Sequence, residues 1–147
     1  MNGTVPAYLK NLTYLTTLRL QLNAFTAIDP DFTGILGLQS LSLQDNLLTG
    51  TLPVGLSTFT GLQHLTLQNN DLSGTMPPEW ASLTYLTELD LSGNSLSGSL
   101  PVEWATMHSL TSFAINDQRA TLVGSFPNAY ANWTTLGFLC APGYSFR

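Results

Sequence analysis

LQHLTLQNNDLSGTMPPEWASL (Leu62 to Leu83) and LTELDLSGNSLSGSLPVEWATM (Leu86 to Met107) are two copies of a pattern that runs through this chain of 147 residues. Prolines mark the repeat at successive spacings of 24, 23, 24, 24 and 26 positions: Pro6, Pro30, Pro53, Pro77, Pro101 and Pro127. A fixed period of this size is typical of a solenoid, in which each repeat is one coil that packs on its neighbours. A solenoid presents extended surfaces rather than enclosed pockets, so we expect function to lie on a surface.

Leucines form three columns when the repeats are aligned. The first column is Leu15, Leu38, Leu62, Leu86, Leu110 and Leu136. The second is Leu18, Leu41, Leu65, Leu89, Phe113 and Leu139, and the third is Leu20, Leu43, Leu67, Leu91, Ile115 and Ala141. The last two columns alternate with polar residues, which is the periodicity of a strand. Each coil is therefore predicted to contribute one short parallel strand with its leucines inward and the intervening residues outward.

Other repeated residues have predicted structural roles. Asparagines follow the strands at a fixed offset, and we expect their amides to bind backbone groups where the coil bends: Asn23, Asn46, Asn70 and Asn94. Glycines before the prolines predict tight turns: Gly50, Gly74, Gly98 and Gly124. In the second unit Ala27 replaces the glycine and Asp29 takes an apolar position, which leaves its local geometry open. The fifth unit has Gln118 in place of the asparagine and two extra residues, so segment 116–121 is expected to bulge.

After each proline the apolar residues are spaced by three, which predicts 3₁₀ or irregular turns on the side opposite the strands. The tryptophans of this region, Trp80, Trp104 and Trp133, are interpreted as core residues rather than as a platform for a ligand.

These columns resemble leucine-rich repeats of the plant-type, 24-residue class, with the pattern L-x-x-L-x-L-x-x-N-x-L-x-G-x-[IL]-P. The resemblance implies an α/β-type solenoid, a right-handed superhelix with a concave parallel sheet and short strands at the G-x-[LM]-P segments. A narrower resemblance, carried by P-x-E-W around Trp80 and Trp104, is to the repeats of trypanosomatid surface antigens and proteophosphoglycans. It implies a secreted or membrane-anchored protein that contacts partner proteins through its repeats.

The repeats predict a single domain over residues 1–147. Its expected parts are a partial repeat at 1–11, full repeats at about 12–35, 36–58, 59–82, 83–106 and 107–132, and a degenerate end at 133–147. Because Met1 falls in the middle of a repeat, we expect a fragment of a longer chain, without its signal peptide. No apolar run approaches the roughly 18 residues that span a bilayer.

Composition limits the class of partner. The chain has four basic and nine acidic residues and a formal charge of −5, which argues against a nucleic-acid surface. Only 9% of residues are charged, and a surface of neutral polar groups suits an extracellular or cell-surface protein.

The outward strand positions form three candidate ligand-binding columns on the concave face. They are Thr17, Ser40, His64, Glu88 and Ser112; Arg19, Ser42, Thr66, Asp90 and Ala114; and Gln21, Gln44, Gln68, Ser92 and Asn116. The three glutamines are expected to line up as a ladder. Two interpretations stay open, a hydrogen-bonding surface for protein, peptide or carbohydrate and a solvated sheet face without a ligand.

Catalysis and metal binding are not expected. His64, Glu88 and Asp90 are predicted to lie within reach of one another, but on an open surface without the pocket that such chemistry needs. No catalytic or phosphate-binding motif occurs, so we expect no enzyme and no cofactor. His108 is expected to be exposed on the convex side.

Two features remain open in the sequence. Asn2, Asn11 and Asn132 each begin an N-x-[ST] sequon and are possible N-glycosylation sites. Cys140 is predicted by register to point outward and is either free or paired with a cysteine outside this chain.

The leading functional hypothesis is a non-catalytic interaction module that binds protein or glycan on its concave face. The alternatives are a structural fragment that self-associates through its coil ends, where Leu9, Leu12 and Leu15 are expected to be uncovered, and an enzyme-inhibitor-like repeat protein.

Overall fold

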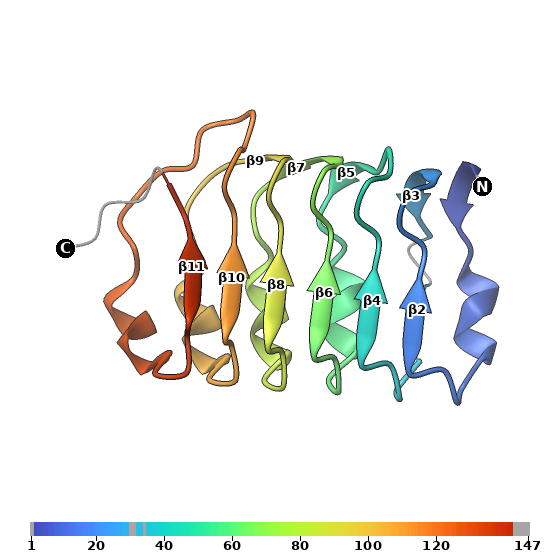
Figure 1. Cartoon of the computed structure of the whole chain (residues 1–147), viewed down its shortest axis with the longest axis horizontal. Coiled ribbons are helices and arrows are strands. Elements are labelled where there is room, and N and C mark those ends of the chain that lie inside the picture. The colour runs from blue at the N-terminus through green and yellow to red at the C-terminus, as the bar shows by residue number, and fades with distance from the viewer. Residues whose placement is uncertain (1, 30–31, 34, 143–147) are drawn as a thin grey trace.

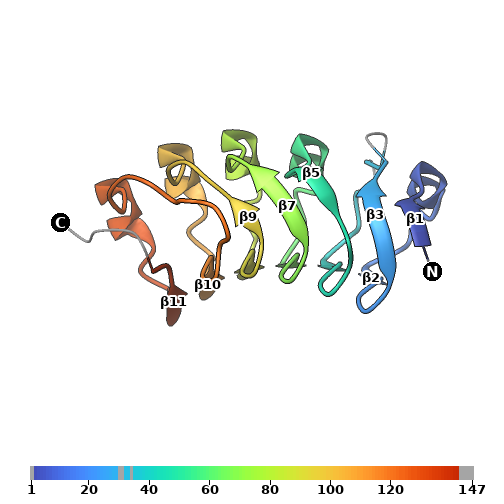
Figure 2. The same ribbon diagram turned by 90° about the horizontal axis from the view of Figure 1, so that it is seen from above.

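The computed structural model describes residues 2–29, 32–33 and 35–142. Over these residues the chain winds as a right-handed coil, in which strands rise on one side and short helices descend on the other (Figure 1). Seen from above, the coils form an arc with the helices on its outer side and the main sheet on its inner side (Figure 2). The predicted concave sheet and convex 3₁₀ turns are confirmed.

Among the residues that the structure describes, the main sheet contains six parallel strands of three residues each, in the order β11-β10-β8-β6-β4-β2. The strands are β2 (Thr17–Arg19), β4 (Ser40–Ser42), β6 (His64–Thr66), β8 (Glu88–Asp90), β10 (Ser112–Ala114) and β11 (Phe138–Cys140). Their central residues are the second leucine column, and four of these point into the core with no exposed surface: Leu41, Leu65, Leu89 and Phe113. The alternation in the sequence therefore predicts the inward and outward faces correctly.

In the described part of the chain, five 3₁₀-helices begin directly after prolines whose backbone is extended. They are η1 (Ala7–Asn11), η2 (Val54–Thr58), η3 (Pro78–Ser82), η4 (Val102–Thr106) and η5 (Asn128–Asn132). A proline fixes φ and lacks an N–H, so it suits the position just before a helix, where the N–H would lack a helical partner. Pro30, the proline of the second unit, lies outside the described residues.

A second set of short strands lies along one flank of the coil (Figure 2). β1 (Asn2–Val5) pairs with β3 (Ala24–Ile28), and β7 (Asp71–Gly74) lies between β5 (Thr49–Thr51) and β9 (Ser95–Leu96). The predicted glycine turns are confirmed, because Gly50, Gly74, Gly98 and Gly124 all have positive φ. In the second unit, which has Ala27 instead, the register with β1 shifts by one residue.

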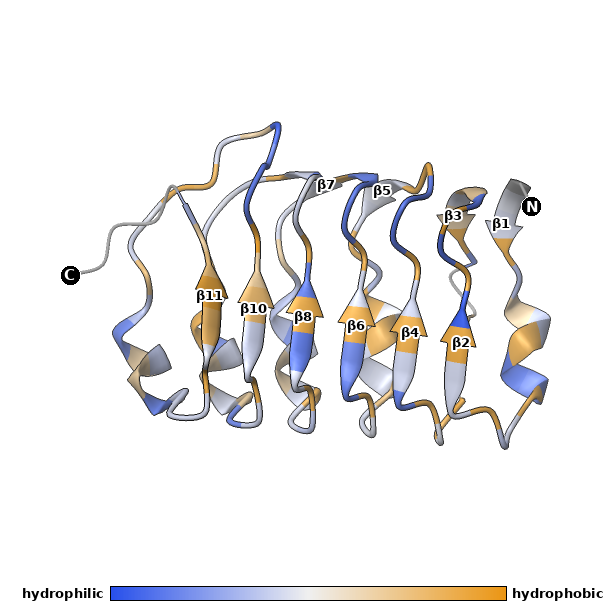
Figure 3. Cartoon of the chain, in the orientation of Figure 1, coloured by the Kyte–Doolittle hydropathy of each residue, from blue (hydrophilic) through white to orange (hydrophobic). Residues whose placement is uncertain are grey.

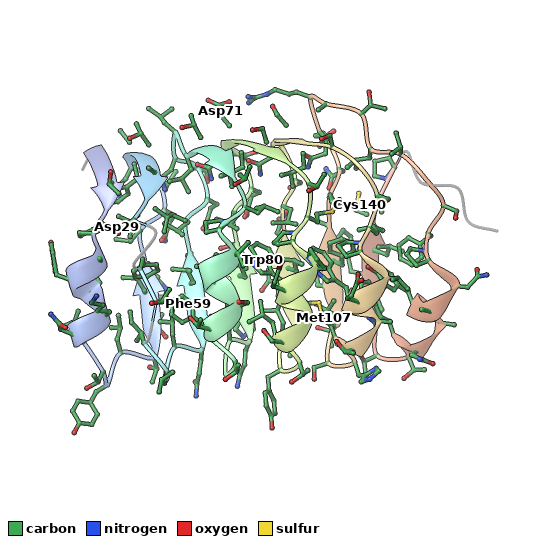
Figure 4. The ribbon with its side chains drawn as sticks, turned by 180° about the vertical axis from the view of Figure 1, so that it is seen from behind. Asp29, Phe59, Asp71, Trp80, Met107 and Cys140 are labelled. Carbon is green, nitrogen blue, oxygen red and sulfur yellow. The ribbon has the colours of Figure 1, made fainter. Side chains whose placement is uncertain are left out.

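The tryptophans are core residues, as predicted, and they also join successive coils. Trp80 (Figure 4) and Trp104 are completely buried, and their rings stack with centroids 6.1 Å apart. The Trp80 indole N–H donates to the carbonyl of Pro53 at 3.1 Å, and the Trp104 indole N–H donates to the carbonyl of Pro77 at 2.9 Å. The indoles of Trp80 and Trp104 thus bind the proline carbonyl of the preceding coil, 27 positions earlier.

The buried asparagines bind backbone groups, as expected. Asn94, for example, donates to the carbonyls of Leu67 and Leu91 at 3.1 and 3.0 Å and accepts from the N–H of Leu72 at 3.1 Å. In the next coil Gln118 takes over this role, since its amide donates to Leu91 and accepts from the N–H of Leu96.

The extra residues of the fifth unit form a loop that rises above the neighbouring coils (Figure 1). The insertion follows Gln118, and the strands on both sides of it keep their register. Arg119, in this loop, forms an ion pair with Asp71, and its backbone N–H donates to the carbonyl of Asn94 at 2.8 Å. The predicted bulge is therefore present, and these contacts tie it to the two preceding coils.

Candidate ligand-binding face

The strand register aligns the outward residues on the inner face of the arc. Thr17, Ser40, His64, Glu88, Ser112 and Phe138 form column one. Arg19, Ser42, Thr66, Asp90, Ala114 and Cys140 form column two. Column three follows the strands and consists of Gln21, Gln44, Gln68, Ser92 and Asn116. The backbone carbonyls of its last four residues accept hydrogen bonds from the preceding coil. The sequence thus predicts the three columns, and the structure adds Phe138 and Cys140 at one end.

Two polar contacts organise the middle of this face. His64 Nδ1 lies 3.2 Å from Glu88 Oε2, and about half of each side chain is exposed. At the other end of β8, the Ser92 N–H and hydroxyl donate to Asp90 Oδ1 at 3.0 and 2.6 Å. His64 and Glu88 therefore meet as predicted, whereas the Asp90 carboxylate accepts its two hydrogen bonds from Ser92 in its own coil.

The glutamines do not form the expected ladder. Gln44 Oε1 accepts a hydrogen bond from the Thr66 hydroxyl at 2.9 Å. The side-chain oxygens of Gln21 and Gln68 are enclosed and have no donor within the described part of the chain. The three residues share a column through their backbones, but their side-chain oxygens are not bonded alike.

Charged and apolar side chains are unevenly distributed along the face (Figure 3). The hydrophilic positions lie at the tip of β2, at the beginning of β6 and at both ends of β8, and β11 is apolar. Phe138 is 54% exposed, Cys140 is half-buried and free, and their neighbour Ala114 is small and buried. The predicted outward register of Cys140 is confirmed by its pairing with Ala114.

The face is open. The described residues hold no group of three or more His, Cys, Asp or Glu side chains that could bind a metal ion. One hollow of about 470 Å³ is lined by residues 11–15, and another of about 350 Å³ lies between segment 115–122 and Pro142. Both lie away from the His64–Glu88 pair, so neither encloses it.

Several other predicted positions lie outside the inner face. Asn11 and Asn132 are exposed, and each is the last residue of a helix on the outer side. The side chain of Asn2 is not described, although its backbone belongs to β1. His108 is exposed, as expected. Among the described residues there is no helix with the length and hydrophobicity that crossing a membrane requires.

Comparison with known proteins agrees with this architecture. Family profiles described as leucine-rich repeat match residues 9–72 and 85–107. The chain is a leucine-rich-repeat solenoid. A segment of 56 residues is 36% identical to the receptor-like kinase TMK2 of Arabidopsis thaliana, and it spans 38% of this chain but only 6% of that protein.

Solved structures of leucine-rich-repeat proteins superpose over almost the whole chain. The ectodomain of the Arabidopsis thaliana membrane receptor kinase GASSHO1/SCHENGEN3, solved with CASPARIAN STRIP INTEGRITY FACTOR 2, has a TM-score of 0.86 and 31% identity over 93% of this chain. The Arabidopsis receptor kinase HAESA, solved with the peptide hormone IDA and the co-receptor SERK1, has a TM-score of 0.89 and 28% identity over 99% of it. This chain spans 16% and 24% of those two chains. A Leptospira interrogans repeat protein, 24% identical with a TM-score of 0.84, shares the fold.

Proposed function

We propose that this chain is a non-catalytic interaction module that binds a protein or peptide segment across its inner face. The observation that carries this proposal is the unbroken register of six parallel strands, which places three columns of outward side chains on one open, concave surface. The repeated leucines, asparagines and tryptophans are buried in the core. The specificity of binding therefore depends on the outward positions, which differ between coils.

The relatives support this assignment. Two solved ectodomains that share this coil, those of GASSHO1/SCHENGEN3 and HAESA, were captured with CASPARIAN STRIP INTEGRITY FACTOR 2 and with a peptide hormone. Since the first is the ectodomain of a membrane receptor kinase, we extend the same location to this chain and place it outside the cell or at its surface.

An enzymatic role has little support from the geometry. His64 and Glu88 are about half exposed, and no enclosing wall excludes water from them. Such exposure leaves the two groups without the desolvated environment in which acid–base chemistry is usually tuned. The pair is better suited to contact a partner than to transfer protons.

A bulky substitution on the inner face tests whether binding takes place there or elsewhere on the surface. A displayed library of linear peptides is selected on the wild-type chain, and the affinities of individual synthetic peptides are measured by fluorescence anisotropy. Ser42→Tyr places a bulky neutral side chain in column two, between Arg19 and Thr66, so we expect binding to weaken at least tenfold. The matched control is Thr58→Tyr at the end of η2 on the outer side, which is exposed.

Thr58→Tyr should leave the affinity unchanged. Selected peptides that bind the Ser42→Tyr chain as tightly as the wild type would place the binding surface elsewhere and contradict the proposal. Thermal unfolding of both variants checks that each remains folded.

The other hypotheses that the sequence suggests have separate tests. The resemblance to trypanosomatid surface antigens rests on P-x-E-W, whose tryptophans have a structural role here. Carbohydrate binding and self-association would be favoured by capture on displayed glycans and by a mass that rises with concentration. An inhibitor-like role would need an enzyme that the chain blocks. Glycans at Asn11 and Asn132, tested by deglycosylation after secretory expression, would lie on the outer side and leave the inner face free.

A further inference from the structure

The charges of the inner face are separated along the arc. Arg19 lies on β2, and within the described residues it makes no ion pair. Asp90 occupies the same column on β8, three strand steps away, and Glu88 stands beside it in column one. At about 4.8 Å per step, the positive and negative positions are about 14 Å apart. Hydroxyl-bearing residues, Ser42 and Thr66, lie between them.

The two carboxylates form a site that is open on one side. Residues two positions apart in a strand point to the same face, so Glu88 and Asp90 project together, about 7 Å apart along the strand. His64 lies against Glu88 on the β6 side. On the β10 side their partners are Ser112 and Ala114, which are small and leave room above them for an incoming side chain.

The end of the face adds an apolar contact. Phe138 follows Ser112 in column one, on β11, and more than half of its surface is exposed. It is two strand steps, about 10 Å, from Glu88. The face therefore presents a cation, a pair of carboxylates and an aromatic ring in that order.

We infer that the occupant of this face is an extended peptide segment with an acidic, a basic and an apolar side chain in the same order. An extended chain advances about 3.4 Å per residue. The basic residue would therefore follow or precede the acidic one by about four positions. The apolar residue would lie about two or four positions beyond it, because only an even spacing keeps the side chains on one face of an extended peptide. This inference rests on the proposed function and specifies its partner.

Charge complementarity favours this occupant over other polymers. A lysine or arginine lying over Ser112 and Ala114 can reach both carboxylates, and an acidic side chain at β2 can meet Arg19. A neutral carbohydrate supplies no cation for the pair, and a nucleic acid would bring phosphates toward it. Because these charges are partly exposed, their contribution to binding must fall as salt is added.

The test compares three chains selected against one displayed library of linear peptides. They are the wild type, a double variant with Glu88→Lys and Asp90→Lys, and a control with Glu79→Lys and Glu103→Lys. The control changes the net charge equally, but at exposed residues in the first turns of η3 and η4. We expect the wild type and the control to enrich Lys or Arg about four positions from Asp or Glu, and the inner-face variant to lose this enrichment at least fivefold.

A milder pair of substitutions, Glu88→Gln and Asp90→Asn, removes the charges with little change of shape and keeps the test valid if the lysine variant unfolds. Peptides from the wild-type selection should bind this chain at least fivefold more weakly, and their affinity for the wild type should fall several-fold between low and high salt.

The outcomes separate the two proposals. The charge pattern would be overturned if peptides blocked by Ser42→Tyr showed no preference for Lys or Arg. It would also be overturned if the control with Glu79→Lys and Glu103→Lys lost the enrichment as much as the inner-face variant. Either result would leave the inner-face assignment intact. Peptides that Ser42→Tyr does not block would overturn both.

Discussion

At the scale of single residues, buried amides connect the coils. Asn46, Asn70 and Asn94 each donate to carbonyls of their own and the preceding coil and accept a backbone N–H from the preceding one. Where a coil bends, these backbone groups have no strand partner, and an unpaired buried group costs about 1–3 kcal/mol. An asparagine has both donors and an acceptor on a short side chain, so it can satisfy several of them at once.

Asn94→Ala should therefore destabilise the chain strongly. The change leaves the Leu72 N–H without its side-chain partner and removes one of the two side-chain amides that donate to the Leu67 carbonyl. We expect a loss of about 1–3 kcal/mol in the free energy of unfolding. Urea unfolding followed by circular dichroism measures this loss. Asn128→Ala, at an exposed position that begins η5, is the control and should change stability by less than about 0.5 kcal/mol. Similar losses in both variants would refute the role assigned to Asn94.

The partners of individual side chains could be predicted only in part. The repeat identifies the asparagines as structural because their offset from each strand is constant. It predicts that Trp80 and Trp104 are buried, but not that their N–H groups bind the proline carbonyls of the preceding coil, since this depends on how far one coil is displaced from the next. The repeat also does not predict the contacts of the glutamine side chains. Their rotamers decide between a ladder and the contact of Gln44 with Thr66.

At the scale of elements, coil length controls where irregularity appears. Main-sheet strands of three residues have little stability alone and depend on pairing with the next coil. A change of length must therefore be absorbed outside these strands. The second unit absorbs it as a shift of register between β1 and β3, and the fifth absorbs two extra residues after Gln118. The sequence shows that these units differ in length, but the place of each adjustment comes from the pairing.

The glycine turns beside the flank sheet provide a test at this scale. Gly74 has φ +79°, and a Cβ added there would lie 3.0 Å from Thr51 Cγ2 on β5. We expect Gly74→Ala to lower the free energy of unfolding by about 1–3 kcal/mol, because alanine disfavours positive φ and the contact is tight. The control is Gly61→Ala, where the Cβ would meet its nearest atom at an ordinary 3.7 Å.

Thermal or urea unfolding measures both alanine variants. Gly61→Ala should stay within about 0.5 kcal/mol of the wild type. A loss at Gly61 equal to that at Gly74 would show that left-handed backbone is not the reason for the repeated glycine.

At the scale of the whole molecule, scaffold and candidate site are divided between inward and outward positions of the same strands. The period-two alternation predicts which residues reach the inner face, and the structure places all of the predicted columns there. What alternation does not predict is chemistry between neighbours, such as the contact of Asp90 with Ser92 rather than with His64. The role of these columns in binding, and the division of the chain into one domain with the expected repeat boundaries, remain predictions.

The stability of a solenoid should depend on position along its axis, because each coil contacts only its neighbours. Leu65 is completely buried between Leu41 and Leu89, whereas Leu18, the equivalent residue of β2, pairs only with Leu41 and is partly exposed. Leu65→Ala should therefore leave a cavity bounded on both sides and cost about 3–5 kcal/mol. Leu18→Ala removes the same atoms at the edge of the sheet, where solvent can enter, and should cost less than half as much. Urea unfolding of the two variants makes the comparison with identical chemistry. Equal losses would mean that the coils unfold without regard to position, and that nearest-neighbour contacts do not govern the stability of this arc.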